Sequence, residues 1–234
     1  MKKILFSCLF IFLISDAFAG HISGGEMSYV YLGPGTIPGT LRYQLTLKLY
    51  RDCNSTGAPI EPSVNFTVFN NLNGQQIINV SGVAGSASQF IQKTPVDPCI
   101  PDNIEMLVCF EYRTYTTIID NLPAIRNGLT VAYQRCCRIG GMTNIVGSAN
   151  FGATYFTTIP GNLTPGNETN TSPVFKTNDT VLICSARPVT FDFSATDADG
   201  DSLVYTFYNA FTGGGNGNGT CFTCLTPDPA APPL

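Results

Sequence analysis

The amino-acid sequence predicts an all-β protein whose main part is an antiparallel β-sandwich. Apolar side chains recur at every second position in several segments, as in strands that bury one face and expose the other. Clusters of Gly, Pro and Asn separate these segments and are typical of turns. No segment combines a helical apolar period with capping residues, and the 23 Gly and 16 Pro fit a turn-rich β protein.

Five segments carry this alternation, and in each of them one set of side chains is expected to face a core while the set between them faces solvent. The expected core positions are Tyr43, Leu45, Leu47 and Leu49 in residues 42–50; Val64, Phe66 and Val68 in residues 63–70; Ile104, Met106, Val108, Phe110 and Tyr112 in residues 103–118; Leu129, Val131 and Tyr133 in residues 129–137; and Val189, Phe191 and Phe193 in residues 189–195. Turns are expected at residues 32–39, 70–75 and 138–144.

Residues 1–19 have the features of a secretory signal peptide. Lys2 and Lys3 supply the positive start, residues 4–14 the apolar core, and the Ala-Phe-Ala sequence at 17–19 a small-x-small cleavage site. The apolar run is shorter than the roughly 20 residues that span a bilayer. We therefore expect cleavage after Ala19, export of the product and no transmembrane segment. A lipoprotein signal with Cys8 as lipid acceptor is the alternative, although it leaves almost no apolar core before that cysteine.

Cleavage removes Cys8 and leaves eight cysteines, an even number that favours disulfides in an exported chain. These are Cys53, Cys99, Cys109, Cys136, Cys137, Cys184, Cys221 and Cys224. Eight cysteines allow 105 pairings, so the sequence leaves the connectivity open. We expect the neighbours Cys136 and Cys137 to have different partners, and Cys221 to bridge Cys224. A structural zinc site is the alternative, but the only histidine that could join it is His21.

A polar stretch rich in Pro and Gly divides the chain. We expect a disulfide-containing sandwich domain over residues 20–160, a linker over residues 161–173, and the beginning of an immunoglobulin- or cadherin-like module over residues 174–234. A sandwich domain usually needs about 100 residues. The last module is therefore expected to be incomplete, and the chain to be the front end of a longer protein.

Four stretches occur in an order that resembles a known family: HISGGEMSYVYLG from residue 21, YQLTLKLYRDCNSTGA from residue 43, VAYQRCCRIGGMTNI from residue 131 and FSATDADGDSLVYTF from residue 193. The chain resembles the N-terminal region of the large secreted surface proteins of Bacteroidetes, and LYRDCN and QRCCR are its most specific motifs. The resemblance implies an array of immunoglobulin-, PKD- or cadherin-like modules. It also implies a gliding-motility-associated C-terminal sorting domain, read by the type IX secretion system. It carries over no catalytic residues.

Asp197, Asp199 and Asp201 concentrate negative charge in a chain of which only 12% is charged. The spacing is not that of an EF-hand, because Ser202 and Tyr208 stand where Gly and Glu are required. It resembles the DxDGD linkers of cadherin-like modules, in which alternate carboxylates gather round Ca²⁺. Calcium takes six to eight oxygens, so further ligands would have to come from elsewhere. The other interpretation is a solvated turn, and the sequence leaves both open.

Composition and motifs favour a non-catalytic role. The formal net charge of −4 with 12 Lys and Arg argues against a nucleic-acid partner. The only histidine, His21, stands at the expected mature N-terminus, which argues against a Ser-His-Asp or Cys-His site. We therefore expect no enzyme, and no cofactor other than the candidate calcium ion.

The expected function is that of a secreted or outer-surface protein in adhesion or gliding motility. Its β-sandwich faces would bind a cell-surface glycan or a protein ligand, beside other modules of the same longer chain. The alternative is a carbohydrate-active enzyme or a carbohydrate-binding accessory domain. Exposed aromatic platforms would favour that alternative, whereas the absence of Trp disfavours it.

Overall fold

The computed structural model describes residues 22–55, 58–91, 109–136, 138–143, 151–163, 169–176 and 190–211, together with residues 145, 148, 165, 167, 188 and 213. The expected signal peptide lies outside the described residues, and so do five of the candidate disulfide cysteines. These are Cys99, Cys137, Cys184, Cys221 and Cys224.

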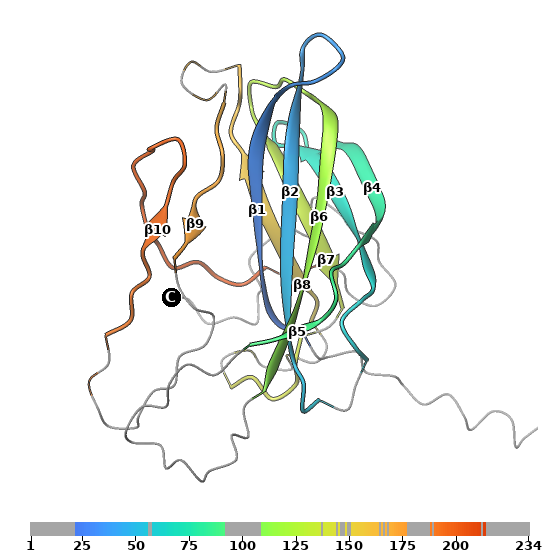
Figure 1. Cartoon of the computed structure of the whole chain (residues 1–234), viewed down its shortest axis with the longest axis vertical. Coiled ribbons are helices and arrows are strands. Elements are labelled where there is room, and N and C mark those ends of the chain that lie inside the picture. Colours follow the sequence, from blue (N-terminus) through green and yellow to red (C-terminus); the bar gives the residue numbers. More distant parts are fainter. Residues whose placement is uncertain are drawn as a thin grey trace, which may run out of the picture.

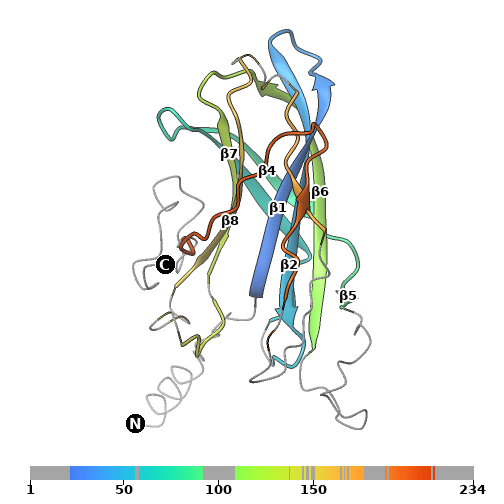
Figure 2. The same ribbon diagram turned by 90° about the vertical axis from the view of Figure 1, so that its left-hand side faces the viewer.

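Two four-stranded sheets face each other and form a sandwich (Figures 1 and 2). The first sheet contains, in spatial order, β1 (Ile22–Pro34), β2 (Thr40–Asp52), β6 (Phe110–Pro123) and β5 (Gln89–Phe90). The second contains β4 (Gln76–Ala84), β3 (Ser63–Asn70), β7 (Leu129–Arg135) and β8 (Ala153–Ile159). All neighbouring strands run antiparallel. The prediction of an all-β, antiparallel sandwich is confirmed.

The core fills the space between the two sheets, and β2 follows the predicted alternation closely. In β2 the side chains at positions 43, 45, 47 and 49 are completely buried, whereas those between them are partly exposed. In β3, Val64, Phe66 and Val68 are buried as expected, but Thr67 and Phe69, which were expected to face solvent, are buried as well. A period of two in hydrophobicity therefore identifies the core face of both strands but predicts an exposed opposite face correctly only for β2.

The prediction for the segment from residue 103 is wrong in its phase. Residues 103–108 lie outside the described part, and β6 begins at Phe110. Phe110 and Tyr112 were expected to face the core, and continuing their alternation along β6 would bury Ile118. In the structure, Tyr115 and Ile119 are buried, whereas Ile118, which has the expected phase, is 43% exposed.

Charged residues on the inner face of β6 explain this error. Glu111 has the phase of Tyr115, and its Oε1 lies 2.7 Å from Nη1 of Arg51. Arg113 has the same phase, and its Nη1 donates a hydrogen bond of 3.1 Å to the carbonyl oxygen of Glu61. A buried charge is tolerated when partners satisfy it, so these polar side chains occupy positions that a hydrophobicity pattern assigns to solvent.

Strand β7 is buried on both faces, although the sequence predicts a half-buried strand. Leu129, Val131 and Tyr133 face the core as predicted, but the intervening Thr130 and Gln134 are buried as well. Strand β7 lies between β3 and β8, and the chain near residue 213 passes over its outer side. The contact is so close that a side chain at position 213 would collide with Gln134.

After β8 the chain contains few regular elements among the described residues. Strand β9 (Val174–Phe175) pairs with β10 (Ala195–Thr196), and this pair lies beside the sandwich in Figure 1. The strand predicted over residues 189–195 is wrong for residues 190–194, which form no strand, and Phe193 is 61% exposed. The expected module over 174–234 stays a prediction, because most of its residues outside 190–211 are not described.

Candidate functional site

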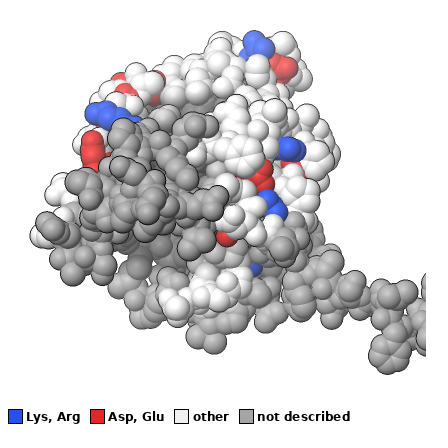
Figure 3. Space-filling view, turned by 60° about the horizontal axis from the view of Figure 1, so that its bottom comes forward, with Lys and Arg blue, Asp and Glu red and all other residues white. Residues whose placement is uncertain are grey.

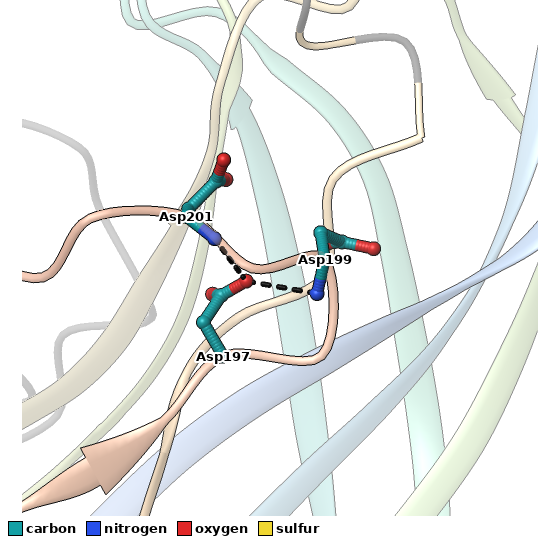
Figure 4. Close-up of side chains that lie close together, drawn as sticks. All are labelled: Asp197, Asp199 and Asp201. Atoms are coloured by element: carbon teal, nitrogen blue, oxygen red, sulfur yellow. Dashed lines mark hydrogen bonds between the residues drawn. The ribbon is translucent and has the colours of Figure 1, made fainter.

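The three aspartates of the sequence analysis lie in one turn, here called the Asp turn (Asp197–Asp201), which follows β10 (Figure 4). One carboxylate oxygen from each of the three lies within 4.8 Å of the others. Asp197 Oδ1 accepts hydrogen bonds from the backbone N–H of Asp199 at 2.9 Å and of Asp201 at 3.1 Å. These bonds and a positive φ of 82° at Gly200 fold the turn tightly.

The other two carboxylates of the Asp turn reach back to the linker between the sandwich and β9. Asp199 Oδ2 accepts a hydrogen bond of 2.6 Å from the backbone N–H of Thr171. Asp201 Oδ2 accepts one of 2.9 Å from the side-chain amide of Asn170. The Asp turn is therefore attached to a segment about 30 residues earlier in the chain rather than fully solvated.

The same linker residues lie along β1, the strand at the edge of the first sheet. The Tyr29 N–H donates to Ser172 Oγ at 2.9 Å, and the Ser172 N–H donates to the Tyr29 carbonyl oxygen at 3.0 Å. The Tyr31 N–H donates to Thr171 Oγ1 at 3.2 Å. Thr171 and Ser172 are buried. We call Asn170–Ser172 the edge strap.

Tyr29 connects the core, the edge strap and the Asp turn. Its ring is buried, and its hydroxyl donates a hydrogen bond to Asn170 Oδ1. Burial raises the pKa of Tyr29 well above its usual value, and the nearby Tyr43 and the three carboxylates of the Asp turn raise it further. The Asp turn therefore lies close enough to the sandwich for its charge to act on a core tyrosine.

The geometry of the Asp turn is compatible with one shared calcium ion. Calcium binds oxygens at about 2.3–2.6 Å, so two ligands on opposite sides of an ion are separated by about 5 Å. The spread of the three carboxylate oxygens falls within that limit. Each carboxylate has a second oxygen, so the hydrogen bonds to the linker do not exhaust its capacity. The remaining ligands would have to come from carbonyl oxygens or water.

A disulfide joins the ends of two neighbouring strands of the first sheet, as the cysteine count predicts. Cys53, just after β2, is bonded to Cys109, just before β6, with a Cα–Cα distance of 5.4 Å. The backbone also joins them, since the N–H of Cys53 donates to the carbonyl oxygen of Cys109. Cys136 is disulfide-bonded as well. The separate partners expected for Cys136 and Cys137, and the Cys221–Cys224 bridge, involve residues outside the described part and stay predictions.

The outer face of the first sheet contains a pair of tyrosines that was not predicted from the sequence. Tyr50 and Tyr112 are register partners on β2 and β6, and their ring centroids are 6.2 Å apart. The ammonium group of Lys48 lies 4.9 Å from the first ring centroid and 4.4 Å from the second. The Tyr50 hydroxyl donates to Glu26, and the Tyr112 hydroxyl donates to Gln89. The outward phase of Lys48 and Tyr50 in β2 was the signal that could have revealed this face.

Three carboxylates that could serve acid–base chemistry are paired with arginines. Arg51 pairs with Glu111, as described above. The pair of Arg135 and Glu61 has an N–O distance of 2.9 Å. The exposed Asp120 pairs with Arg42 at 2.7 Å. The first two pairs hold the chain between β2 and β3 in place, because Arg51 also donates to carbonyl oxygens of that segment.

On the face in Figure 3, the acidic and basic side chains of the described residues lie next to one another rather than in a patch of one sign. The described residues on this face therefore form no concentrated positive patch of the kind that attracts nucleic acids. Among the residues that the structure describes, no helix has the length and apolar character that crossing a membrane would take.

Comparison of the chain with protein-family models, with curated proteins and with solved structures found no match.

Proposed function

We propose that this chain is a non-catalytic part of an exported cell-surface protein that presents β-sandwich faces to a ligand, in adhesion or gliding motility. The observation that carries the proposal is the disulfide between Cys53 and Cys109 in an antiparallel sandwich. Disulfides persist in oxidising compartments, which agrees with the signal peptide expected over residues 1–19. The pairing of Glu61 and Glu111 with arginines supports a structural use of these partly buried acids.

The family resemblance is part of this proposal. The LYRDCN and QRCCR motifs favour kinship with the large secreted surface proteins of Bacteroidetes, and hence secretion by the type IX system. Residues 174–234 are then the start of an immunoglobulin- or cadherin-like module.

The location is tested on intact cells that express the native protein. Antibodies to the sandwich should label unpermeabilised cells, and protease added outside should remove the signal. Thiol labelling of the denatured, unreduced product should find no reactive cysteine. A protein that is protected from protease in intact cells and carries two or more free thiols would contradict export. Deletion of the gene should then reduce attachment or gliding, and unchanged behaviour would contradict the assigned role.

We further propose that the Asp turn binds Ca²⁺ at the millimolar concentrations found outside cells. Three carboxylates within 4.8 Å repel one another, and a hard divalent cation relieves that repulsion. Binding should be measured by calorimetry with CaCl₂ on the chain from Gly20 onward. The expected result is one site that the Asp199→Ala, Asp201→Ala double variant lacks and that Asp192→Ala retains. If titration to millimolar calcium gives no heat of binding, the Asp turn is a hydrogen-bonded turn without a calcium site.

A second candidate function, carbohydrate binding, is favoured by Tyr50 and Tyr112. Two adjacent rings on a flat sheet face offer a stacking surface for sugar C–H groups, and Lys48, Glu26 and Gln89 offer donors and acceptors for hydroxyls. A glycan array probed with the wild type and with Tyr50→Ala, Tyr112→Ala tests it, with Tyr205→Ala as a control from the other part of the chain. Equal array signals for all three proteins would eliminate this face as a glycan site.

A further inference from the structure

Strand β1 presents an edge that needs protection. It is 13 residues long, it ends the first sheet among the residues that the structure describes, and Glu26 is its one charged residue. Its outward side chains include Val30 and Leu32, each 40% exposed. Natural proteins blunt such edges with lysine, with interior proline, or with a covering segment, because a long neutral edge pairs with other strands. Strand β1 has no lysine, and its proline stands at the last position.

The edge strap is that covering segment. Ser172 satisfies both the N–H and the carbonyl oxygen of Tyr29, and Thr171 satisfies the N–H of Tyr31. At Tyr29 and Tyr31 the strap thus takes the hydrogen-bonding positions that an added strand would use. Because Thr171, Ser172 and Asn170 bind β1 largely through side-chain oxygens, the strap is attached at these two residues rather than by a full backbone ladder.

The far side of the strap is held by the Asp turn. The Thr171 N–H points away from β1 and donates to the Asp199 carboxylate, and the Asn170 amide donates to Asp201. Bonds to ionised acceptors are shorter and stronger than bonds between neutral groups. Asp197 positions both carboxylates, because its own oxygen binds the backbone N–H groups of residues 199 and 201. The strap therefore lies between a strand edge on one side and two anionic acceptors on the other.

We propose that Asp199 and Asp201 are a latch that keeps the edge strap on β1, and that release of the latch opens β1 to edge-to-edge pairing with β1 of a second copy. A second copy is the occupant because two antiparallel β1 edges present the same low-charge row to each other, as a closed two-fold contact requires. The latch acts through hydrogen bonds that are already made without a metal ion.

Amide hydrogen exchange tests the latch. The measurement uses the chain from Gly20 onward in EDTA, so that calcium plays no part. In Asp199→Ala, Asp201→Ala, exchange at the Tyr29 and Tyr31 amides should accelerate about tenfold or more, while amides of β7 should be unchanged. Asp192→Ala removes one exposed carboxylate from the same region, whose hydrogen bonds go to the backbone and side chain of Ser194, and should leave both tyrosine amides protected. Unchanged exchange at Tyr29 and Tyr31 in the double variant would overturn the latch.

Molar mass tests the second half of the proposal. Light scattering should find the wild type and Asp192→Ala monomeric, and the double variant in equilibrium with a dimer that grows with concentration. Replacing Val30 by Lys in the double variant should restore the monomer, because charge on an edge opposes pairing. A double variant with fast tyrosine exchange that remains monomeric at all concentrations would show that the edge does not pair.

Discussion

The sandwich and the segment that follows it (residues 174–211) contain similar apolar side chains, but the sandwich buries them and the following segment exposes them. Phe66 in β3 is completely buried, whereas Phe207 in the following segment is 84% exposed. Both lie in stretches of alternating apolar residues. In the sandwich, β3 has partners on both sides and a second sheet across the core; among the described residues after 173, one two-residue ladder is available. Alternation therefore produces a buried strand only where neighbouring strands and an opposing sheet exist.

The largest expected effect is on the free energy of unfolding, when the same Phe→Ala substitution is made once in each of the two regions. Phe66→Ala should lower the free energy of unfolding by about 3–5 kcal/mol, because it leaves a cavity in a sealed core. Phe207→Ala should change it by less than about 0.5 kcal/mol, since the ring is already in water. Urea unfolding followed by circular dichroism measures both. Similar losses for the two variants would mean that Phe207 is buried in solution, and the contrast between the regions would fail.

The disulfide should have the next largest effect, and it acts on the sandwich. Replacing Cys53 and Cys109 by Ser should cost about 2–4 kcal/mol, because the bond closes a loop with a sequence separation of 56 and restricts the unfolded chain. The melting temperature of the double variant, compared with the wild type under the same oxidising conditions, measures the loss. An unchanged melting temperature would mean that the backbone contacts alone hold these strand ends together.

Alkaline pH should destabilise the sandwich through its tyrosines. Burial raises the pKa of Tyr155 to about 12 and raises the pKa of four others, Tyr29, Tyr43, Tyr115 and Tyr133. Because these folded-state values exceed the unfolded value near 10, the unfolded chain loses the protons first. The contribution of these tyrosines to stability should be constant below about pH 10. Above it, stability should fall by up to about 1.4 kcal/mol per tyrosine for each pH unit.

Tyrosinate absorbance and near-ultraviolet circular dichroism, recorded together on titration, check this prediction. The ionisation of the buried tyrosines should coincide with loss of the dichroism signal. Complete ionisation of all tyrosines with the dichroism intact would show that the core tyrosines are accessible to water.

The smallest expected effect concerns the following segment. If Ca²⁺ binds the Asp turn with a Kd near 10⁻⁴ M, calcium at about 10⁻³ M stabilises the folded state by roughly 1.4 kcal/mol. The melting temperature should rise by a few degrees. The rise should be absent in Asp199→Ala, Asp201→Ala and present in Asp192→Ala. A wild type that melts at the same temperature in calcium and in EDTA, at equal ionic strength, would contradict the site.

The local hydrophobicity pattern was sufficient to predict which face of β2 is buried, but not to predict the buried face of β6. The inner face of β6 contains two charged residues, Glu111 and Arg113. Glu111 is paired with Arg51, and Arg113 donates a hydrogen bond to the carbonyl oxygen of Glu61. These partners are 60 and 52 residues away in the chain. No window of sequence around β6 contains them, so the phase could not be predicted from that window.

The candidate site, too, was predicted only in part from the sequence. The spacing of Asp197, Asp199 and Asp201 was enough to predict a cluster of carboxylates, since residues two apart in a tight turn stay close. The linker residues that donate hydrogen bonds to these carboxylates were not predicted. Asn170 is 141 residues from Tyr29, and Thr171 is 28 residues from Asp199.

The sequence by itself determined the fold class, the buried face of β2 and the acidic turn, because each depends on residues that are neighbours along the chain. Tertiary structure decided which face of β6 is buried, that Cys53 bonds to Cys109, and that the linker runs along β1 with the Asp turn behind it. These features depend on hydrogen bonds, ion pairs and a covalent bond between segments that are distant in the sequence, so no local preference of the chain encodes them.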